Sequence, residues 1–591
     1  QSAGLDLGEG QLFITGLATG REQAEIHAAV NGPLSKALAL IDHPPLGYAT
    51  EMGIAPEDAE GTAKVHLRIA LPLILDLDLQ DVQIAADARL RGAAIPGALH
   101  GFDLDHADLN LAVDKRGMEV KGRGNVAGMP ADISWRENFG DKVPFRTILD
   151  LAGRIPDVAH LRELGLNVGI LHEDHVRGAV GANVRFTVLS DDETRVEVRA
   201  DLEEARLAVD RIKWVKPLGA TGRAEINLTF KNGKPREISH FALYAEDLAV
   251  AGKGSFEDDS TAVQRLDFTR INHGRTDMKG ALIRRADGAW DLGFHGAGLD
   301  LSPVWKSLTE GGDSDLLGDF VLAAEVDKVW IGEDRVLSDV SGTFQRENNI
   351  WRTVYLKSVM ENAAVLDVEL KPDLKTGNRT LLVNTSDAGV VLRTLGVYDN
   401  MQGGVLRLVG NFDDSDPDHP LKGQLMIQDY RVLKAPVLAH LVSIMALTGI
   451  LDALEGDGLG FAVLDIPFTM RSGVIEITDA RAAGTSLGFT ASGTVYTHAD
   501  VVDLQGTVVP AYALNSALGR IPIIGNIFTG GEKGSGLFAA NFRMTGPQED
   551  PKVDVNPLSA LAPGFLRRLF GVFGESAPAP VEDPSSLLTT Q

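Results

Sequence analysis

Cysteine is absent from this chain of 591 residues, and aromatic residues make up only 6% of it. Without thiols the protein has no disulfide framework and no thiolate nucleophile, a composition compatible with an oxidising compartment. The interior of a closed β-sandwich usually contains bulky aromatic side chains. The apolar residues of this sequence are instead mainly Leu, Val, Ile and Ala, which suit either a tightly packed interior or a smooth channel wall.

Basic residues are scarce as well. Lys and Arg number 56 against 82 Asp and Glu, which gives a net charge of −26. Nucleic acid requires a basic protein face to neutralise its phosphates, so the charge argues against nucleic acid as a partner. The same charge does not exclude a lipid that is held by its tails inside an apolar cleft.

The sequence has no clear membrane-spanning segment. The longest apolar helical pattern covers residues 436–454, but His440 and Asp452 interrupt it, which favours a helix packed on a sheet over a bilayer span. The chain begins at Gln1 without a basic-then-apolar signal segment, and we therefore expect a mature or trimmed chain.

Alternation of apolar and polar residues dominates the sequence, as expected for strands. In one run apolar residues fill every odd position: Val65, Leu67, Ile69, Leu71, Leu73, Leu75, Leu77 and Leu79. Pro72 lies at an even position and predicts a bend or a split there. Ile226, Leu228 and Phe230 repeat the alternation, and glycines between such runs suit a sheet that curls. A few short helices are expected, at residues 33–41, 156–165, 303–308, 389–395 and 436–454.

Three motifs invite a chemical interpretation, and none has the required context. Residues 484–488 match G-x-S-x-G around Ser486, but a strand pattern follows where a nucleophile elbow needs a helix. His172 and His175 share a face only on a helix, and their segment looks like a turn. The acidic stretch 413–418 lacks the glycine and distal glutamate of an EF-hand loop. The sequence thus predicts no catalytic residue, no metal site and no cofactor, and we expect no enzyme.

Residues 503–547 contain an apolar insert between two predicted strands, which predicts a plug or cap at the end of a long sheet. This stretch, with residues 550–568, 385–389, 398–404 and 435–456, resembles the C-terminal region of AsmA-like proteins of the Gram-negative cell envelope. The YhdP-type branch is the most similar. Earlier residues resemble the family only through repeated strands and glycine turns.

The resemblance implies a mainly β fold, namely a long curled antiparallel sheet that is open along one side like a taco. It also implies a bridge-like phospholipid transport protein in the periplasm, which connects inner and outer membranes and supports outer-membrane integrity. An upstream membrane anchor, envelope protein partners and a monomeric state are expected with it. Alternation alone favours packed sandwiches, so a structural or adhesive envelope protein without lipid is the alternative.

The expected organisation is a repetitive β-groove region over residues 1–384, an AsmA-like region over 385–573 and a disordered tail over 574–591. The residues expected to line the groove are Val65, Leu67, Ile69, Leu71, Leu73, Leu75, Leu77, Ile226, Leu228 and Phe230. An amphipathic segment near the C-terminus is expected either to contact a membrane or to dock on the sheet end. Its candidate residues are Phe565, Leu566, Arg567, Arg568, Leu569, Phe570 and Phe573.

Overall fold

The computed structural model describes residues 4–556 except for the following: 18–21, 44–47, 52, 79–80, 100, 141, 158–159, 161–174, 191, 259, 306–317, 435–438, 440–453, 455, 485, 511–539 and 549–550. The chain divides into two units, Gln1–Ala286 and Asp287–Gln591. The predicted boundary at residue 385 therefore lies inside the second unit. The predicted plug, the C-terminal amphipathic segment and the tail lie outside the described residues.

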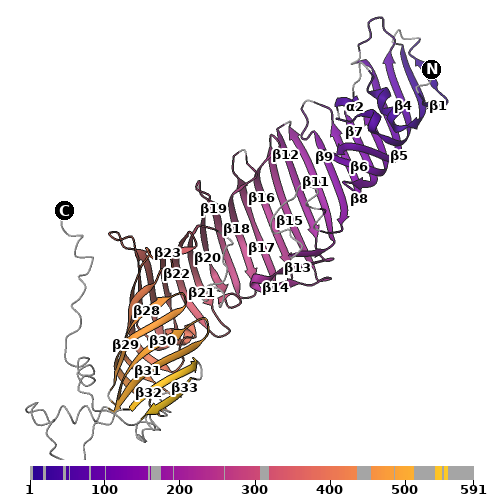
Figure 1. The fold of residues 1–591 in the computed structure, drawn as a ribbon. Coiled ribbons are helices and arrows are strands. Elements are labelled where there is room, and N and C mark those ends of the chain that lie inside the picture. Colours follow the sequence, from indigo (N-terminus) through magenta and orange to yellow (C-terminus); the bar gives the residue numbers. More distant parts are fainter. Residues whose placement is uncertain are drawn as a thin grey trace, which may run out of the picture. The chain divides into compact units, whose positions relative to one another are not determined.

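The first unit is a sheet in which neighbouring strands follow one another in chain order (Figure 1). Its strands are β1 (Asp6–Leu7), β2 (Gln11–Thr15), β3 (Gln23–Pro33), β4 (Glu60–Pro72), β5 (Gln83–Leu99), β6 (Phe102–Asp114), β7 (Gly117–Val126), β8 (Met129–Asn138), β9 (Thr147–Ile155), β11 (Val180–Ser190), β12 (Glu193–Asp201), β15 (Gly222–Lys231), β16 (Lys234–Ala245), β17 (Leu248–Phe256), β18 (Val263–His273) and β19 (Thr276–Arg284). From β3 onward each strand pairs antiparallel with the next in this list, whereas β1 and β2 both pair with β3.

A few short elements accompany this sheet. Helix α1 (Leu34–Ile41) starts directly after Pro33, and its Leu34 and Leu38 are buried against the sheet. Two shorter elements follow it, α2 (Tyr48–Glu51) and the 3₁₀ turn η1 (Pro56–Asp58). A separate three-stranded sheet is formed by β10 (Val176–Gly178), β13 (Ala205–Val209) and β14 (Trp214–Lys216), with the 3₁₀ turn η3 (Asp210–Ile212) between the last two strands.

The second unit repeats this architecture. Its strands are β20 (Trp290–Asp300), β21 (Phe320–Trp330), β22 (Val336–Glu347), β23 (Ile350–Val359), β24 (Val365–Pro372), β25 (Arg379–Thr385), β26 (Met401–Phe412), β27 (Leu421–Val432), β28 (Leu459–Arg471), β29 (Val474–Gly484), β30 (Leu487–Tyr496), β31 (Val501–Pro510), β32 (Ala540–Pro547) and β33 (Lys552–Asn556). Each pairs with the next, and the 3₁₀ turn η4 (Glu361–Ala363) precedes β24.

One helix of the second unit has both of its ends determined by local chemistry. The side chain of Asp387 accepts a hydrogen bond from the backbone N–H of Val390 at 3.0 Å and caps the start of α5 (Ala388–Leu395). Gly396 then ends the helix in a left-handed conformation with φ of 73°. Ala388 packs into the core of the second unit beside Met401 and Ile427.

The mainly β fold with a few short helices is confirmed. Antiparallel pairing also holds, with an exception between β20 and β21, which run parallel. The run that begins at Val65 is shorter than its alternation suggests. Strand β4 ends at Pro72, where a bend or a split was predicted, and Leu73, Leu75 and Leu77 lie beyond it. The predicted helices at 33–41 and 389–395 are present as α1 and α5.

Candidate functional site

One face of the sheet in the first unit is apolar from β3 to β19. Residues directly opposite each other on paired strands point to the same face, so the strand register can be followed across the sheet. We call the resulting line the central row. It consists of Val30, Val65, Ala88, Leu111, Val120, Trp135, Leu149, Phe186, Val196, Leu228, Ile238, Gly254, Leu266 and Leu282. None of these fourteen residues is charged.

The rows on either side of the central row are also mainly apolar. The first begins at Gly32 and Ala63, contains Ile226, and ends at Gly280 without a polar residue. Its full order is Gly32, Ala63, Leu90, Leu109, Gly122, Ile133, Leu151, Val184, Val198, Ile226, Phe241, Gly252, Phe268 and Gly280. The row on the other side contains both Leu67 and Phe230.

The register brings together residues that the sequence predicted separately. Val65 and Leu228 lie in the central row, and Ile226 and Phe230 flank Leu228 on the same strand. Ile69 and Leu71 continue the same face of β4. All of these residues are partly buried. The apolar segments near residues 65 and 228 therefore belong to one continuous surface.

The opposite face of this sheet is polar. One row there consists of Asn31, Lys64, Arg89, Asn110, Lys121, Ser134, Asp150, Arg185, Glu197, Asn227 and His240. Its members interact with one another: the Arg185 guanidinium lies 2.6 Å from the Asp150 carboxylate, and Arg89 donates to Asn110 at 3.2 Å. The polar face is thus the solvated one, and the apolar face is turned inward.

Burial along the central row is uneven. Leu149 is 1% exposed and Val120 is 4% exposed, whereas Val65, Phe186 and Leu228 are only partly buried. A sandwich core would bury the members of such a row completely over its length. Beside the main sheet, the strands described in the first unit form only the small sheet of β10, β13 and β14. Other parts of the protein therefore cover some of the apolar face, and the rest is accessible to solvent.

The second unit has an apolar row of the same kind. It consists of Leu292, Leu322, Phe344, Val354, Leu370, Leu381, Gly410, Gly423, Phe468, Ile477, Gly493, Leu504, Met544 and Val553. Fourteen strands contribute one residue each, and again none is charged. Each unit therefore has an apolar face of its own.

Aromatic rings lie over glycines at several points of these faces. A Cβ added at Gly252 would lie 2.6 Å from the ring of Phe241, which is directly opposite on the paired strand. Gly423 has the same relation to Phe468, at 2.8 Å. A ring that covers a glycine lies flat on the sheet and keeps the face smooth. The sequence pattern predicted only that glycines between the alternating runs suit a curling sheet, and it did not reveal these ring–glycine pairs.

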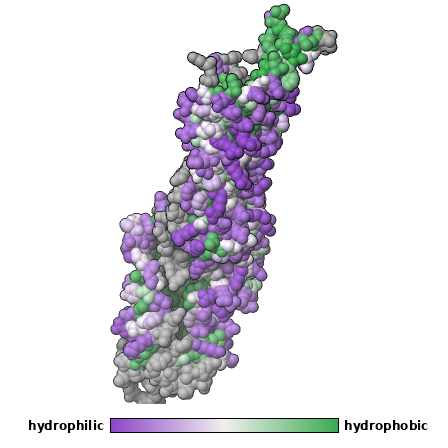
Figure 2. Space-filling view, turned by 90° about the vertical axis from the view of Figure 1, so that its right-hand side faces the viewer, coloured by the Kyte–Doolittle hydropathy of each residue, from purple (hydrophilic) through white to green (hydrophobic). Residues whose placement is uncertain are grey.

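Figure 2 shows an exposed apolar patch at the N-terminal end of the first unit. Its members on β2 are Leu12 at 61% exposure and Phe13 at 47%. Leu73, Leu75 and Leu77 add to it beyond the end of β4, and Leu75 is fully exposed. These three predicted groove residues are thus outside the sheet, unlike Val65 to Leu71.

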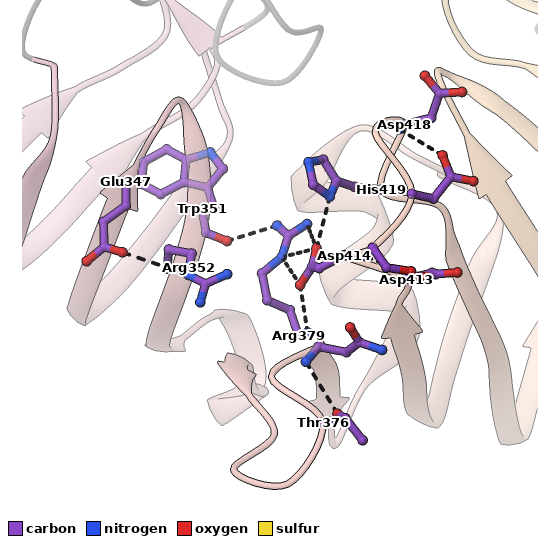
Figure 3. Close-up of polar contacts among 12 residues, drawn as sticks. Glu347, Trp351, Arg352, Thr376, Arg379, Asp413, Asp414, Asp418 and His419 are labelled. Atoms are coloured by element: carbon purple, nitrogen blue, oxygen red, sulfur yellow. Dashed lines mark hydrogen bonds and ion pairs between the residues drawn. The ribbon is translucent and has the colours of Figure 1, made fainter.

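The acidic stretch 413–418 contacts two arginines, Arg379 and Arg471, and Figure 3 shows the pairing of Arg379 with Asp414. Arg379, only 5% exposed, donates to both carboxylate oxygens of Asp414, and its guanidinium lies 4.2 Å from the centre of the Phe412 ring. Arg471 pairs with Asp416 at 2.7 Å and with Asp418 at 3.0 Å. Burial acts to raise the pKa of Asp414, but the hydrogen bonds from Arg379 outweigh it and hold that pKa below the usual range. Three carboxylates of this acidic stretch, those of Asp414, Asp416 and Asp418, thus pair with arginine side chains.

The other chemical motifs are also accounted for where they are described. Ser486 lies in the turn between β29 and β30, so a strand and not a helix follows it. The ring of His175 bonds to the carbonyl of Ala208 at 3.2 Å, while His172 lies outside the described residues. Within the described ranges no group of three or more His, Asp or Glu side chains is arranged to hold a metal ion.

A cavity of about 790 Å³ opens where the small sheet meets β9, β11 and β12. Charged residues line it, among them Arg154, Asp201, Glu203 and Glu204. Arg154 donates to Glu204 at 2.8 Å and so spans part of the opening. These charged groups do not favour a hydrocarbon chain, and the residues of the central row are not among those that line the cavity.

No helix in the described part of the chain is long and apolar enough to cross a bilayer. The segments 436–454 and 557–573, which include the candidate membrane contacts Phe565 to Phe573, lie almost wholly or wholly outside that part.

Comparisons of the whole chain with models of protein families, with characterised proteins and with solved structures gave no match. The resemblance to AsmA-like proteins therefore stays a prediction. The functional argument below rests on the geometry of the two apolar faces.

Proposed function

We propose that this protein carries phospholipids with their acyl chains against the apolar faces of its sheets. The central row of the first unit is the observation that supports this most directly. Fourteen neighbouring strands of the sheet each place an uncharged residue in it, and the adjacent residues on the other face are mainly polar. Each methylene group that leaves water for such a surface gains roughly 0.8 kcal/mol, so the face can hold a chain that water expels.

The length of the row favours a path over a pocket. Thirteen intervals of about 4.8 Å give roughly 60 Å along the first unit alone. The hydrocarbon core of a bilayer is about 30 Å thick and contains two acyl chains end to end, so one chain needs about 15 Å. A carrier of a single lipid does not need an apolar surface as long as about four acyl chains. It suits lipids that follow one another along the sheet.

The uniform chemistry of the row also favours movement. Leu, Val, Ile, Phe, Trp, Ala and Gly all offer dispersion contacts to hydrocarbon, so no position holds a tail much more strongly than the next. Such a surface lowers the cost of carrying a lipid through water without trapping it. Net transport then follows the difference in lipid concentration between the two ends.

The cellular setting is part of the same proposal and rests on the AsmA-like resemblance. In it the protein lies in the periplasm of a Gram-negative bacterium, is anchored to the inner membrane by an upstream segment, and delivers phospholipid to the outer membrane. Envelope proteins at either membrane are expected partners of a monomeric bridge. We propose no enzymatic step, because transport along the face requires none.

A structural or adhesive envelope protein is the second candidate. The almost complete burial of Leu149 and Ile427, each 1% exposed, favours it, since these positions resemble an ordinary packed core. The two candidates differ in what contacts Leu228 and its neighbours: hydrocarbon tails in the first, other side chains in the second.

Site-specific photo-crosslinking separates the two candidates. A photoreactive amino acid at Leu228 faces the apolar side, whereas one at the adjacent Asn227 faces the polar side of the same strand. The protein is expressed in a Gram-negative host, irradiated in intact cells, and examined by mass spectrometry for lipid adducts. We expect adducts at position 228 and none at 227. Adducts at neither position, with the protein folded, would exclude lipid from this face and favour the structural candidate.

A further inference from the structure

One carboxylate lies among the apolar rows of the first unit. The row beside the central row on the Leu67 side consists of Ala28, Leu67, Ala86, Val113, Met118, Glu137, Thr147, Val188, Thr194 and Phe230. Glu137 is its only charged member. It follows Trp135 of the central row by two positions on β8, so both side chains point to the apolar side.

Two hydrogen bonds hold this carboxylate in place. Oε2 of Glu137 accepts the indole N–H of Trp135 at 3.0 Å and the hydroxyl of Thr147 at 2.8 Å. Thr147 is 4% exposed, and Met118, which lies opposite Glu137 on β7, is 7% exposed. The carboxylate is therefore partly buried and fixed, and neither of these bonds uses its second oxygen, Oε1.

The charge of Glu137 has no protein counter-ion among the described residues, where no Lys, Arg or His side chain pairs with it. The apolar side of the second unit provides the contrast, because its buried Arg379 is fully paired with Asp414. A partly buried carboxylate without a cation is unfavourable. A cation brought by a ligand would remove that cost.

We infer that Glu137 binds the ammonium group of a lipid headgroup, so that the preferred cargo of this face is a lipid with a protonated amine. The inference rests on the proposed function, since the tails must lie on the apolar face for the headgroup to reach the carboxylate. An ammonium group donates charge-assisted hydrogen bonds to Oε1, and the indole of Trp135 adds an aromatic surface that attracts cations. A headgroup with only negative charge is repelled at the same place.

The test is a competition between two lipids. The purified full chain is incubated with vesicles of equal parts phosphatidylethanolamine and phosphatidylglycerol with identical acyl chains. It is then re-isolated, and its bound lipids are quantified by mass spectrometry. We expect a roughly fivefold enrichment of phosphatidylethanolamine over phosphatidylglycerol in the bound lipid. This factor lies between the small effect of an exposed ion pair on binding and the larger effect of a buried one.

The variant Glu137→Gln is the decisive comparison. Glutamine keeps an oxygen that accepts from Trp135 and Thr147, so the fold is preserved while the charge is lost. We expect the total bound lipid to stay unchanged and the enrichment to disappear. Glu119→Gln is the matched control, because Glu119 lies on the neighbouring strand β7, is only partly buried, and pairs with Lys121 at 2.6 Å on the polar face. This control should keep the enrichment.

The outcomes separate this inference from the proposed function. Absence of bound lipid from the unmodified protein would contradict the proposed function, and the inference would be lost with it. Bound lipid without enrichment, or with an enrichment that Glu137→Gln leaves intact, would overturn the inference alone. In that case Glu137 serves only as the acceptor for the Trp135 indole.

Discussion

The ion pair between Arg379 and Asp414 provides a sharp test of how the second unit is held together. We predict that Asp414→Ala destabilises this unit by about 3–5 kcal/mol, because it leaves a buried guanidinium without a counter-ion. Arg379 and Asp414 are only 5% and 12% exposed, so solvent screens the pair little. The substitution also removes the acceptor for the backbone N–H of Arg379, which Asp414 binds at 2.9 Å.

The same pair predicts how stability depends on pH. The pKa of Asp414 is lowered in the folded protein, so its contribution is complete above the unfolded pKa of about 4 and is lost as the pH falls through the folded pKa. The unmodified protein should therefore lose stability below about pH 4 more steeply than Asp414→Ala does.

Denaturant unfolding followed by tryptophan fluorescence is a suitable assay. The backbone carbonyl of Trp351 accepts a hydrogen bond from Arg379. The centre of its ring lies 5.8 Å from that of Phe320 and 6.4 Å from that of Phe344. Replacement of both partners, as in Arg379→Met with Asp414→Leu, should cost much less than Asp414→Ala alone, because no unpaired charge remains. A loss below about 1 kcal/mol for Asp414→Ala would show that water reaches the pair and would refute the reasoning.

Two further predictions concern the first unit. Gly252→Val should destabilise it by about 2–3 kcal/mol in denaturant unfolding, because the new side chain collides with Phe241 and with the backbone of Asp267; an unchanged midpoint would contradict the ring-over-glycine packing. Lys216 is 0% exposed, and burial lowers its pKa below that in the unfolded chain. Folding therefore releases a proton, and the free energy of unfolding should rise with pH up to about 10. The variant Lys216→Met should lack this rise. If the free energy of unfolding changed with pH in the same way for the unmodified protein and for Lys216→Met, this result would contradict the burial of Lys216.

Much of the fold follows from the sequence because alternation with a period of two has one structural meaning. Val65 to Leu71 and Ile226 to Phe230 alternate cleanly, and both runs are strands with their apolar residues on one face. Local rules also placed α1 after Pro33. Alternation does not provide an end point: it continues to Leu79, whereas strand β4 ends at Pro72.

The site itself was only half predictable. The sequence identified apolar runs, but their union into one surface depends on register, and register depends on which strands are neighbours. Glu137 shows the limit most clearly. In the sequence it is one of many acidic residues between polar neighbours, and only the pairing of β8 with β7 and β9 places it beside Met118 and Thr147. The pairing of Arg379 with Asp414, 35 positions apart, was hidden for the same reason.

Lipid content after a single charge substitution tests the central claim most directly. Leu228→Glu places a carboxylate in the middle of the central row, whereas Asn227→Glu places the same group on the polar face one residue away. Both proteins are purified alongside the unmodified chain, compared for fold by circular dichroism, and extracted for phospholipid analysis by mass spectrometry. We predict that Leu228→Glu loses most of its bound phospholipid while Asn227→Glu retains it. Equal lipid content in both variants, or none in the unmodified protein, would contradict the claim that this face carries hydrocarbon chains.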